Sequence, residues 1–426
     1  MTDTEKIYWD NFYKSNPDIR EPSDFAKYIH TKYIAQFNKS TVFLKIGDLG
    51  CGNCRDSLFF ASLGNYIYAI DKSSIPCKTH TNLNLILDDV ETSITNNKLE
   101  TLLDVVYMRW FLHSVPYDKG AQIFTESIKN LKPNALLCIE VRSSNDTELI
   151  KNSTYNESDK SYSTTHKRWL YSIEMIKKLA EENNLDIIEL VENYDFSKTN
   201  HNEAYVSNPL LIRFVARKKL IQHYENSKNF NIYKDILPEK KNRSLLSYKQ
   251  IPIFNKILRV YNVKYIAIAG TVLGLSRHGG IIPWDDDVDV GFIKSEWNKL
   301  SKLKTIFEKN GLKYTAIKSN AGKAGSTHCH FGTIDCFLLS DIPGEYYAGD
   351  AKTFCHKEEY KNCHKQIFGP GPVFINAPFC SKKSLSYRYG KTYFEEGDVN
   401  DNRHYKNNSI GRFELNHNDY SFQLFK

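Results

Sequence analysis

Short apolar runs alternate with helical patterns throughout residues 42–217, and this alternation limits the possible folds more than any other feature of the chain. The runs favour strands at 43–49, 66–70, 83–87, 103–107, 135–141, 185–191 and 210–216. Strands separated by helices form βαβ units, whose strands lie parallel in one sheet. The last two runs lie close together, which suits one antiparallel edge pair. We therefore predict an α/β fold with a mainly parallel sheet and flanking helices.

The rest of the chain follows a different pattern. Residues 218–243 are polar and charged, which is typical of a connection between domains. We expect a helix at 244–261, followed by YIAIAGTVLGLSRHGG, a pattern typical of a strand that turns at glycine into a helix. A chain of 426 residues is long enough for two or three domains. We therefore predict one domain at 1–217, a linker at 218–243 and an α+β domain at 244–426.

Charge and composition limit the partners and the location. The net charge is +7, but Lys and Arg are scattered among acidic residues, so we expect an anionic small-molecule substrate and no nucleic acid. The first residues have no apolar stretch typical of a signal peptide, and no run of about 18 apolar residues follows, so we expect a cytoplasmic protein without a membrane span. The nine cysteines lack the paired spacing of a zinc framework and are expected to be reduced thiols.

A glycine-containing turn follows the first predicted strand in the stretch IGDLGCGNCRD, residues 46–56. Gly50 and Gly52 let the backbone turn sharply and approach a ligand closely. Asp71 ends the next strand, where an acidic group accepts hydrogen bonds from ribose hydroxyls. A nicotinamide cofactor would require a third glycine where Arg55 stands. The turn therefore favours S-adenosylmethionine, although an ordinary loop without a ligand is the alternative.

The motifs DLGCGNCRDSLFF, YAIDKS, LILDDVE, DVVYMRWFLHSV and LLCIEVRS, within residues 5–217, resemble those of class I S-adenosylmethionine-dependent methyltransferases. The resemblance implies a Rossmann-like sheet and this cofactor. It assigns six residues to the methionine pocket, the ribose and the adenine in turn: Asp48, Gly50 and Gly52, then Asp71, then Asp89 and Val90. Cys54 stands where the family has a third glycine, and a side chain there is expected to crowd the cofactor.

Four basic side chains are candidates for the mouth of a substrate site: Arg109, His113, His166 and Arg168. Arg109 and His113 follow a strand end, where open α/β sheets bind their ligands. Methyl transfer to an alcohol requires a base that takes the hydroxyl proton, and His113 is the candidate. The alternative is that His113 only packs against or caps a helix.

Aspartates crowd the stretch GGIIPWDDDVDVGF, residues 279–292. Asp287 and Asp289 share one face of a strand, with Cα atoms roughly 6–7 Å apart. Asp335, in the strand pattern FGTIDCFLL, offers a third carboxylate. Such oxygen ligands suit Mg²⁺ or Mn²⁺. An EF-hand fits poorly because Val290 occupies the position that requires glycine, and an ion-free acidic loop conflicts with the apolar flanks.

Gly270 and Thr271 lie between a strand and a helix, whose N-terminal amides suit phosphate oxygens, and Arg277 follows within two turns. The segment AGTVLGLSRHGGIIPWDDDVDVGF closely resembles the LicD family, and the likeness extends over about 245–395 through IDCFLL and VFINAPFCSKKSLSYRYG. That family has a nucleotidyltransferase-like fold and transfers phosphocholine or polyol phosphate from CDP-activated donors to glycans. The resemblance assigns Gly270 and Thr271 to phosphate, and Asp287, Asp289 and Asp335 to metal and catalysis.

The segment KTYFEEG replaces the family's usual tryptophan-containing stretch after Tyr389-Gly390, which leaves donor and acceptor open. Trp284 either stacks on a base or packs in the core. We interpret the chain as a bifunctional transferase that adds a phosphorylated headgroup to a glycan and methylates the glycan or the headgroup. Two alternatives stay open: an enzyme that methylates and nucleotidylates RNA, and a scaffold whose methyltransferase half has decayed at Cys54.

Overall fold

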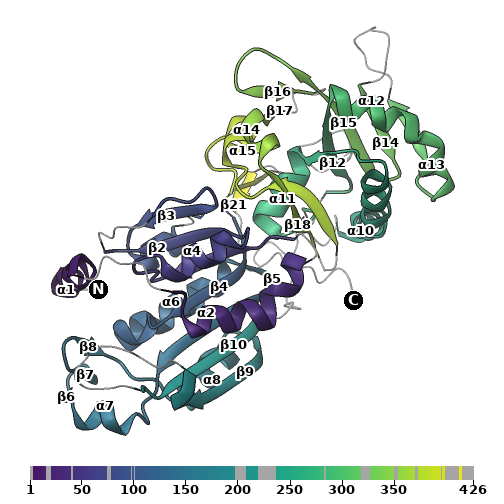
Figure 1. Cartoon of the computed structure of the whole chain (residues 1–426). Helices are drawn as coiled ribbons and strands as arrows, with labels where there is room; N and C mark the ends of the chain where they lie inside the picture. Colours follow the sequence, from purple (N-terminus) through teal and green to yellow (C-terminus); the bar gives the residue numbers. More distant parts are fainter. Residues whose placement is uncertain are drawn as a thin grey trace. The chain divides into compact units, whose positions relative to one another are not determined.

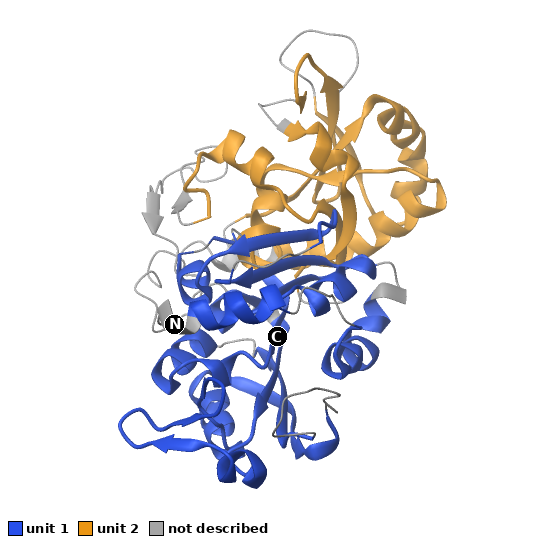
Figure 2. Cartoon of the chain, turned by 60° about the vertical axis from the view of Figure 1, so that its left-hand side comes forward, with its two compact units in different colours: residues 1–99, 103–219 blue, residues 100–102, 220–426 orange. Residues whose placement is uncertain are grey.

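The computed structural model describes most of the chain, as two compact units. The described residues are 3–15, 21–39, 42–73, 78–96, 98–99, 101–196, 208–218, 237–282, 285–317, 327–349, 354–369, 373–394, 396–398 and 412–414. The first unit comprises residues 1–99 and 103–219, and the second comprises 100–102 and 220–426 (Figure 2). None of the helices in these described ranges is both long and apolar enough to cross a membrane.

One seven-stranded sheet forms the centre of the first unit (Figure 1). Its order is β3-β2-β1-β4-β5-β10-β9, with bounds Leu83–Leu87, Tyr66–Asp71, Lys45–Leu49, Leu103–Arg109, Leu131–Arg142, Leu211–Lys218 and Leu185–Asn193. The strands from β3 to β5 pair in parallel, while β10 runs antiparallel to both of its neighbours. The predicted fold class is therefore confirmed, including the antiparallel pair at one edge.

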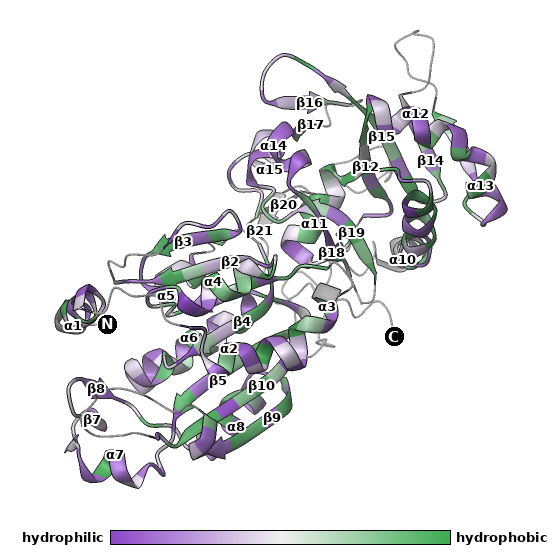
Figure 3. Ribbon diagram, in the orientation of Figure 1, coloured by the Kyte–Doolittle hydropathy of each residue, from purple (hydrophilic) through white to green (hydrophobic). Residues whose placement is uncertain are grey.

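Helices flank this sheet, and most of its core side chains are fully buried. The helices are α1 Asp3–Ser15, α2 Asp24–Ile29, α3 Ala35–Lys39, α4 Arg55–Ser62, α5 Val90–Thr95, α6 Tyr117–Lys129, α7 Thr147–Lys151 and α8 Ile173–Glu182. A small sheet contains β6 Thr154–Asn156, β7 Ser161–Ser163 and β8 Lys167–Arg168. All five residues of β1 are buried, as expected for a parallel strand that is covered on both faces. Figure 3 shows hydrophobic residues along β5 and hydrophilic ones over much of α7.

The second unit combines a mixed sheet with helices, which confirms its predicted α+β class. The main strand order is β11-β12-β15-β14-β13, with bounds Ile266–Ala267, Val288–Ile293, Ile334–Asp341, His328–Phe331 and Tyr314–Ile317. Only the β12–β15 pairing within this order is parallel. Further strands are β16 Tyr346–Ala348, β17 Phe354–His356, β18 Cys363–Ile367, β19 Phe374–Pro378, β20 Glu396–Asp398 and β21 Arg412–Glu414. The parallel pair brings the two predicted acidic strands into direct contact.

The helices of this unit are α10 Leu237–Val260, α11 Ala269–His278, α12 Lys294–Leu300, α13 Lys304–Lys309, α14 Lys357–Lys361 and α15 Lys382–Tyr389. The predicted helix at 244–261 thus begins earlier, and residues 237–243, which were predicted as linker, are helical. Residues 219–236 and Trp284 lie outside the described residues. The predicted functional division of the chain into domains stays a prediction.

Helix α11 packs closely against the chain that follows it. It ends at Gly279, whose left-handed φ of 71° is a conformation that glycine adopts without strain. A Cβ at Gly274 would lie 2.3 Å from the carbonyl oxygen of Gly280 and 3.0 Å from the backbone nitrogen of Ile282. The return of the chain toward β12 therefore requires a glycine at this point of the helix.

Gly274→Ala tests this close approach. Alanine inside a helix is normally more stable than glycine by about 1 kcal/mol. Here we expect the opposite, a loss of about 1–3 kcal/mol in the unfolding free energy, because backbone atoms must move. Urea unfolding followed by circular dichroism measures the change. Asn298→Ala, at an exposed position of α12, is the control and should change stability by less than about 0.5 kcal/mol. A stabilised Gly274→Ala variant would contradict the packing.

Candidate functional site

The first unit contains a pocket of about 730 Å³ around the carboxyl ends of β1, β2 and β4. Every site residue predicted for this half lines it: Asp48, Gly50, Gly52, Asp71, Asp89, Val90, Arg109, His113, His166 and Arg168. Carboxyl ends of parallel strands are where open α/β sheets bind ligands. The structure therefore brings these residues together, while the individual roles assigned to them stay predictions.

The glycine turn and Asp71 form the best-ordered part of this pocket. The carboxylate of Asp71 accepts hydrogen bonds from the backbone N–H groups of Gly52 (2.9 Å) and Ser73 (2.8 Å). Burial raises the pKa of Asp71 and raises that of Asp48 to about 7. Gly52 has a left-handed φ of 54°, and a Cβ there would meet the Tyr13 hydroxyl at 2.2 Å. The turn therefore requires glycine both for its own conformation and for the approach of α1.

Cys54 begins helix α4 from a left-handed conformation, with φ of 59°. Its side chain is fully buried, with Sγ 3.9 Å from the Cys51 sulfur. Cys51, Gly52 and Asn53 line the pocket, whereas Cys54 is not among the described residues that do so. The expected crowding of the cofactor is therefore not what this geometry favours, because the side chain lies behind the turn.

His113 is held in one orientation by the backbone. Its Nδ1 accepts a hydrogen bond from the Arg142 N–H at 3.2 Å. Burial, together with the charges of Arg142 and Arg168, holds the pKa of His113 well below its usual range. A neutral ring with an accepting Nδ1 carries its proton on Nε2 and is a donor there. The predicted role of His113 as a base stays untested, and this orientation disfavours it.

Arg109 and Trp110 are positioned by a buried carboxylate. Glu140 of β5 lies 3.3 Å from Nε of Arg109 and accepts hydrogen bonds from Trp110 (3.1 Å) and Arg213 (2.8 Å). The Arg109 guanidinium lies 4.3 Å from the Trp110 ring centroid. A buried carboxylate between two guanidiniums fixes their geometry. The position of Arg109 in the pocket therefore depends on Glu140, a buried residue of β5.

Helix α1 contributes pocket residues that sequence reasoning missed. Tyr8, Trp9, Phe12 and Tyr13 all line the pocket. The Tyr8 hydroxyl lies 3.0 Å from Nδ1 of His166, and the Trp9 and His166 ring centroids are 4.9 Å apart. The i, i+4 spacing of these aromatic side chains in YWDNFY indicates one helix face, which was the available signal.

The second site is a row of side chains across three neighbouring strands. Asp289 of β12 is paired with Asp335 of β15, and Asp335 is paired with His330 of β14. Paired residues point to the same face of a sheet, as do residues two apart, which adds Asp287 and His328 to the row. Ligand atoms of Asp287, Asp289 and Asp335 all lie within 4.8 Å of one another. The structure therefore brings the three predicted metal ligands together.

These carboxyl groups raise one another's free energy. Burial raises the pKa of Asp287, and the negative charges of Asp289 and Asp285 add to the effect. Burial and the charges of Asp285 and Asp335 likewise raise the pKa of Asp289. Burial alone would raise the pKa of Asp335, but hydrogen bonding from the two histidines outweighs it and lowers that pKa. The group is therefore an arrangement that a bound cation would stabilise.

The turn before α11 contacts the aspartates directly. The Gly270 N–H donates to Oδ2 of Asp289 at 3.2 Å, and the Thr271 hydroxyl accepts from the Asp289 N–H at 2.6 Å. A Cβ at Gly270 would lie 2.7 Å from Oδ2 of Asp285. Both residues therefore position Asp289 in this structure, and their predicted contact with phosphate stays a prediction.

The cation beside the aspartates is a residue that sequence reasoning missed. Arg388 of α15 lowers the pKa of Asp289 through its charge. Arg277 lies about 10 Å further along α11 than Gly270, and its guanidinium donates to the Tyr393 carbonyl oxygen at 3.2 Å. The predicted role of Arg277 therefore stays a prediction, and Arg388 is the better-placed residue. VFINAPFCSKKSLSYRYG, which contains Arg388, was the available signal.

Both sites fit the groups that their sequences imply. Three carboxylates are the hard oxygen ligands that Mg²⁺ and Mn²⁺ prefer. In the first unit, Asp71 is anchored by two backbone amides at the rim of a pocket large enough for a nucleoside ligand. The chemistry of each donor set is therefore compatible with a divalent cation and with S-adenosylmethionine, respectively.

Comparison with known families identifies part of the second unit. Residues 262–334 match the family described as LicD/FKTN/FKRP, nucleotidyltransferase domain, which confirms the LicD-type domain predicted from the sequence. An uncharacterized protein of Rickettsia prowazekii is 34% identical over 148 residues, which are 32% of this chain and 53% of that protein. The lipopolysaccharide cholinephosphotransferase LicD of Haemophilus influenzae is 32% identical over 59 residues, 14% of this chain and 22% of that protein. The matches thus span about half of the first relative and less of the other.

Solved structures of S-adenosylmethionine-dependent methyltransferases resemble part of the chain. A methyltransferase from Anabaena variabilis is 13% identical, with a TM-score of 0.37, and the match covers 51% of this chain and 96% of that one. The 1,6-didemethyltoxoflavin-N1-methyltransferase of Burkholderia thailandensis is 14% identical, with a TM-score of 0.36, and covers 49% and 84%. A likeness at this level does not establish an activity.

Asp287→Asn tests whether the aspartates are held together against their repulsion. In EDTA, we expect the variant to be more stable than the wild type by about 1 kcal/mol, because it avoids the cost of burying a carboxyl group whose charged form is opposed by burial and by the neighbouring aspartates. Mg²⁺ should raise the melting temperature of the wild type and have little effect on the variant. Thermal unfolding with and without Mg²⁺ measures both effects. Asp341→Asn, an exposed carboxylate at the end of β15, is the control and should behave like the wild type. Lower stability of Asp287→Asn in EDTA would contradict the repulsion.

Proposed function

We propose that the second unit transfers a phosphorylated headgroup, of the phosphocholine or polyol-phosphate type, from a CDP-activated donor to a glycan hydroxyl. The observation that carries the proposal is the convergence of Asp287, Asp289 and Asp335 within 4.8 Å beside the N-terminus of α11. The family match at 262–334 supports a phosphotransferase of the LicD type. The relative from Haemophilus influenzae is a lipopolysaccharide cholinephosphotransferase, which supports choline phosphate among the candidate headgroups.

The chain's own residues have separate tasks in this reaction. Asp287, Asp289 and Asp335 would hold a divalent ion, which supplies positive charge that stabilises the phosphates of the donor. Arg388 would add positive charge near Asp289, and this charge opposes the rise in the pKa of Asp289. Gly270 and Thr271 keep Asp289 in place through the backbone contacts described above. Together these groups align the donor so that the bond to CMP breaks as the new phosphodiester bond forms.

The proton balance of the transfer also falls on this site. The acceptor oxygen forms a bond to the β-phosphorus, the bond between that phosphorus and CMP breaks, and the hydroxyl proton leaves. Asp335 is the candidate to receive that proton, because it lies beside Asp287 and Asp289 and the imidazoles of His328 and His330, 3.4 and 3.2 Å from its Oδ2, orient it. Together with Asp287 and Asp289, the Asp335 carboxylate would also bind the ion.

For the first unit, we propose methyl transfer from S-adenosylmethionine to the same glycan or to the added headgroup. The cofactor would supply a methyl group on a sulfonium. The lining residues support this: Asp71 would accept hydrogen bonds from the ribose hydroxyls, and Arg109, Arg142 and Arg168 would offer positive charge to an anionic acceptor. Binding measurements on the same purified protein distinguish this proposal from two alternatives. Steeply salt-dependent RNA binding would favour an RNA-modifying enzyme, and failure to bind S-adenosylmethionine at millimolar concentration would favour a scaffold.

Asp287→Asn should abolish headgroup transfer and leave the first unit intact. We expect CMP release from one CDP-linked donor in the presence of Mg²⁺, lost in EDTA and reduced about 100-fold or more in the variant, because the ion loses a ligand. Mass spectrometry of CMP, across a panel of CDP-linked donors with and without candidate glycans, measures it. Asp341→Asn is the matched control from β15. No release from any donor would exclude the proposed donor class, and loss of both activities in Asp287→Asn would exclude two independent sites.

Asp71→Ala tests cofactor binding in the first unit. Removing the carboxylate deletes hydrogen bonds to a ribose hydroxyl worth about 1.5–3 kcal/mol, so the dissociation constant for S-adenosylmethionine should rise about 10- to 100-fold. Isothermal titration calorimetry measures the constant. Glu182→Gln, an exposed carboxylate of α8, should bind the cofactor like the wild type. Unchanged affinity in Asp71→Ala would place the ribose elsewhere.

A further inference from the structure

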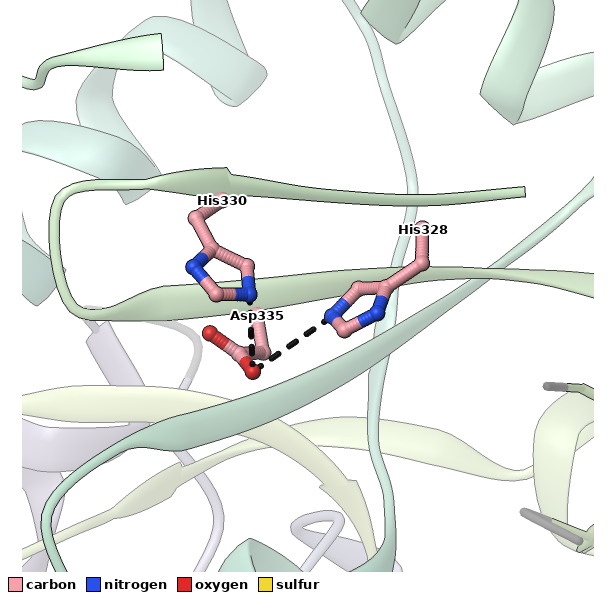
Figure 4. A group of neighbouring side chains, drawn as sticks. All are labelled: His328, His330 and Asp335. Atoms are coloured by element: carbon pink, nitrogen blue, oxygen red, sulfur yellow. Dashed lines mark ion pairs between the residues drawn. The ribbon is translucent and has the colours of Figure 1, made fainter. Parts of the chain in front are cut away.

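Beyond orienting Asp335, the two histidines of β14 form with it a group of possible metal ligands that the proposed transfer does not use. Nε2 of His328 lies 3.4 Å and Nε2 of His330 lies 3.2 Å from the same oxygen, Oδ2 of Asp335 (Figure 4). Figure 4 shows both rings extending from one strand toward the carboxylate on its neighbour. All three ligand atoms lie within 4.8 Å of one another. Two imidazoles and a carboxylate thus converge on one point.

Regular secondary structure holds this group in place. His328 and His330 are two residues apart in β14, so their side chains point to the same face, and His330 is paired with Asp335 across the antiparallel strands. The His328 ring also stacks on Phe337 of β15, with centroids 4.2 Å apart and an interplanar angle of 18°. The side chains of His328 and His330 are 18% and 30% exposed, which leaves access for a small ion. Sites on strands hold their ligands more precisely than sites on loops.

The distances match the edges of a metal coordination tetrahedron. With bonds of about 2.0–2.1 Å to nitrogen and oxygen, donor atoms in a four-coordinate zinc site are about 3.3–3.4 Å apart. Octahedral coordination at about 2.0–2.1 Å, as for Mg²⁺, would bring neighbouring donors to about 2.9 Å. The observed 3.2 and 3.4 Å, which are also ordinary distances between an imidazole and a carboxylate, are compatible with two edges of such a tetrahedron. Imidazole nitrogen is also a ligand of zinc rather than of magnesium.

We propose that His328, His330 and Asp335 form a second divalent-metal site, which takes Zn²⁺ or a similar borderline ion beside the three-aspartate site. Three protein ligands leave one coordination position open, the arrangement of exchangeable rather than purely structural zinc. Asp335 belongs to both groups and would bridge the two ions. The site shares Asp335 with the three-aspartate site but does not depend on the donor and acceptor proposed above, because it follows from the two imidazoles and their common carboxylate.

Zinc binding by the full chain tests the site directly. We expect the wild type to retain one Zn²⁺ per chain in equilibrium dialysis with elemental analysis, and Co²⁺ in its place to give the strong visible absorption of four-coordinate cobalt. His328→Gln/His330→Gln should bind Zn²⁺ at least 10-fold more weakly. His364→Gln is the matched control, because His364 is also half-buried beside an aromatic ring, Phe379, but lies on β18. The control should bind like the wild type.

Three results would overturn the site. They are no Zn²⁺ retained by the wild type, equal retention by the double variant, or loss of Zn²⁺ in Asp287→Asn, which would place the ion among the three aspartates. If the double variant does not fold, chemical modification of the wild-type histidines replaces it: Zn²⁺ should protect His328 and His330 from diethylpyrocarbonate but not His364, and absence of protection overturns the proposal. None of these measurements depends on CMP release, so failure of the site and failure of the proposed transfer are distinguishable.

Discussion

The parallel pairing of β12 with β15 places Asp289 against Asp335, and the second unit is arranged around this unfavourable contact between carboxylates. The turn before α11 and helix α15 both accommodate this contact. Gly270 has no side chain because a Cβ would collide with Asp285, and its N–H donates to Asp289. Arg388 reaches the group from α15. Proteins retain such repulsion mainly where a cation relieves it, which supports the proposal that the paired strands β12 and β15 carry a functional site.

The first unit uses the same geometric rule with a different chemistry. Parallel strands end at a common edge, so the turns after β1, β2 and β4 meet around one pocket. The charges of the buried carboxylates there are compensated by neighbouring groups. Asp71 accepts hydrogen bonds from two backbone amides, and Glu140 lies between two guanidiniums. These contacts hold the carboxylates of the pocket in defined positions. Helix α1 adds an aromatic wall from the start of the chain.

The imidazoles of β14 change the chemistry that the acidic row supports. A site of aspartates alone suits hard ions such as Mg²⁺, whereas His328 and His330 add nitrogen ligands next to one shared carboxylate. Hydrogen bonding from these histidines also sets Asp335 apart, since its pKa falls while those of Asp287 and Asp289 rise. One strand pairing thus gives three similar aspartates different properties.

The strands and most of the candidate site residues could be predicted from the sequence, because periodicity and glycine turns are local. Every predicted strand of the first unit is present, the predicted pocket residues line one cavity, and the three predicted aspartates converge. The side chains that lie opposite these pocket residues and aspartates could be identified from the tertiary structure alone. The aromatic face of α1, Arg388 and the two histidines reach their sites through strand pairing and helix packing between distant segments, and the tautomer of His113 follows from one backbone N–H. The aromatic spacing of YWDNFY and the segment that contains Arg388 are visible in the sequence, but register and packing across the fold decide which site they reach.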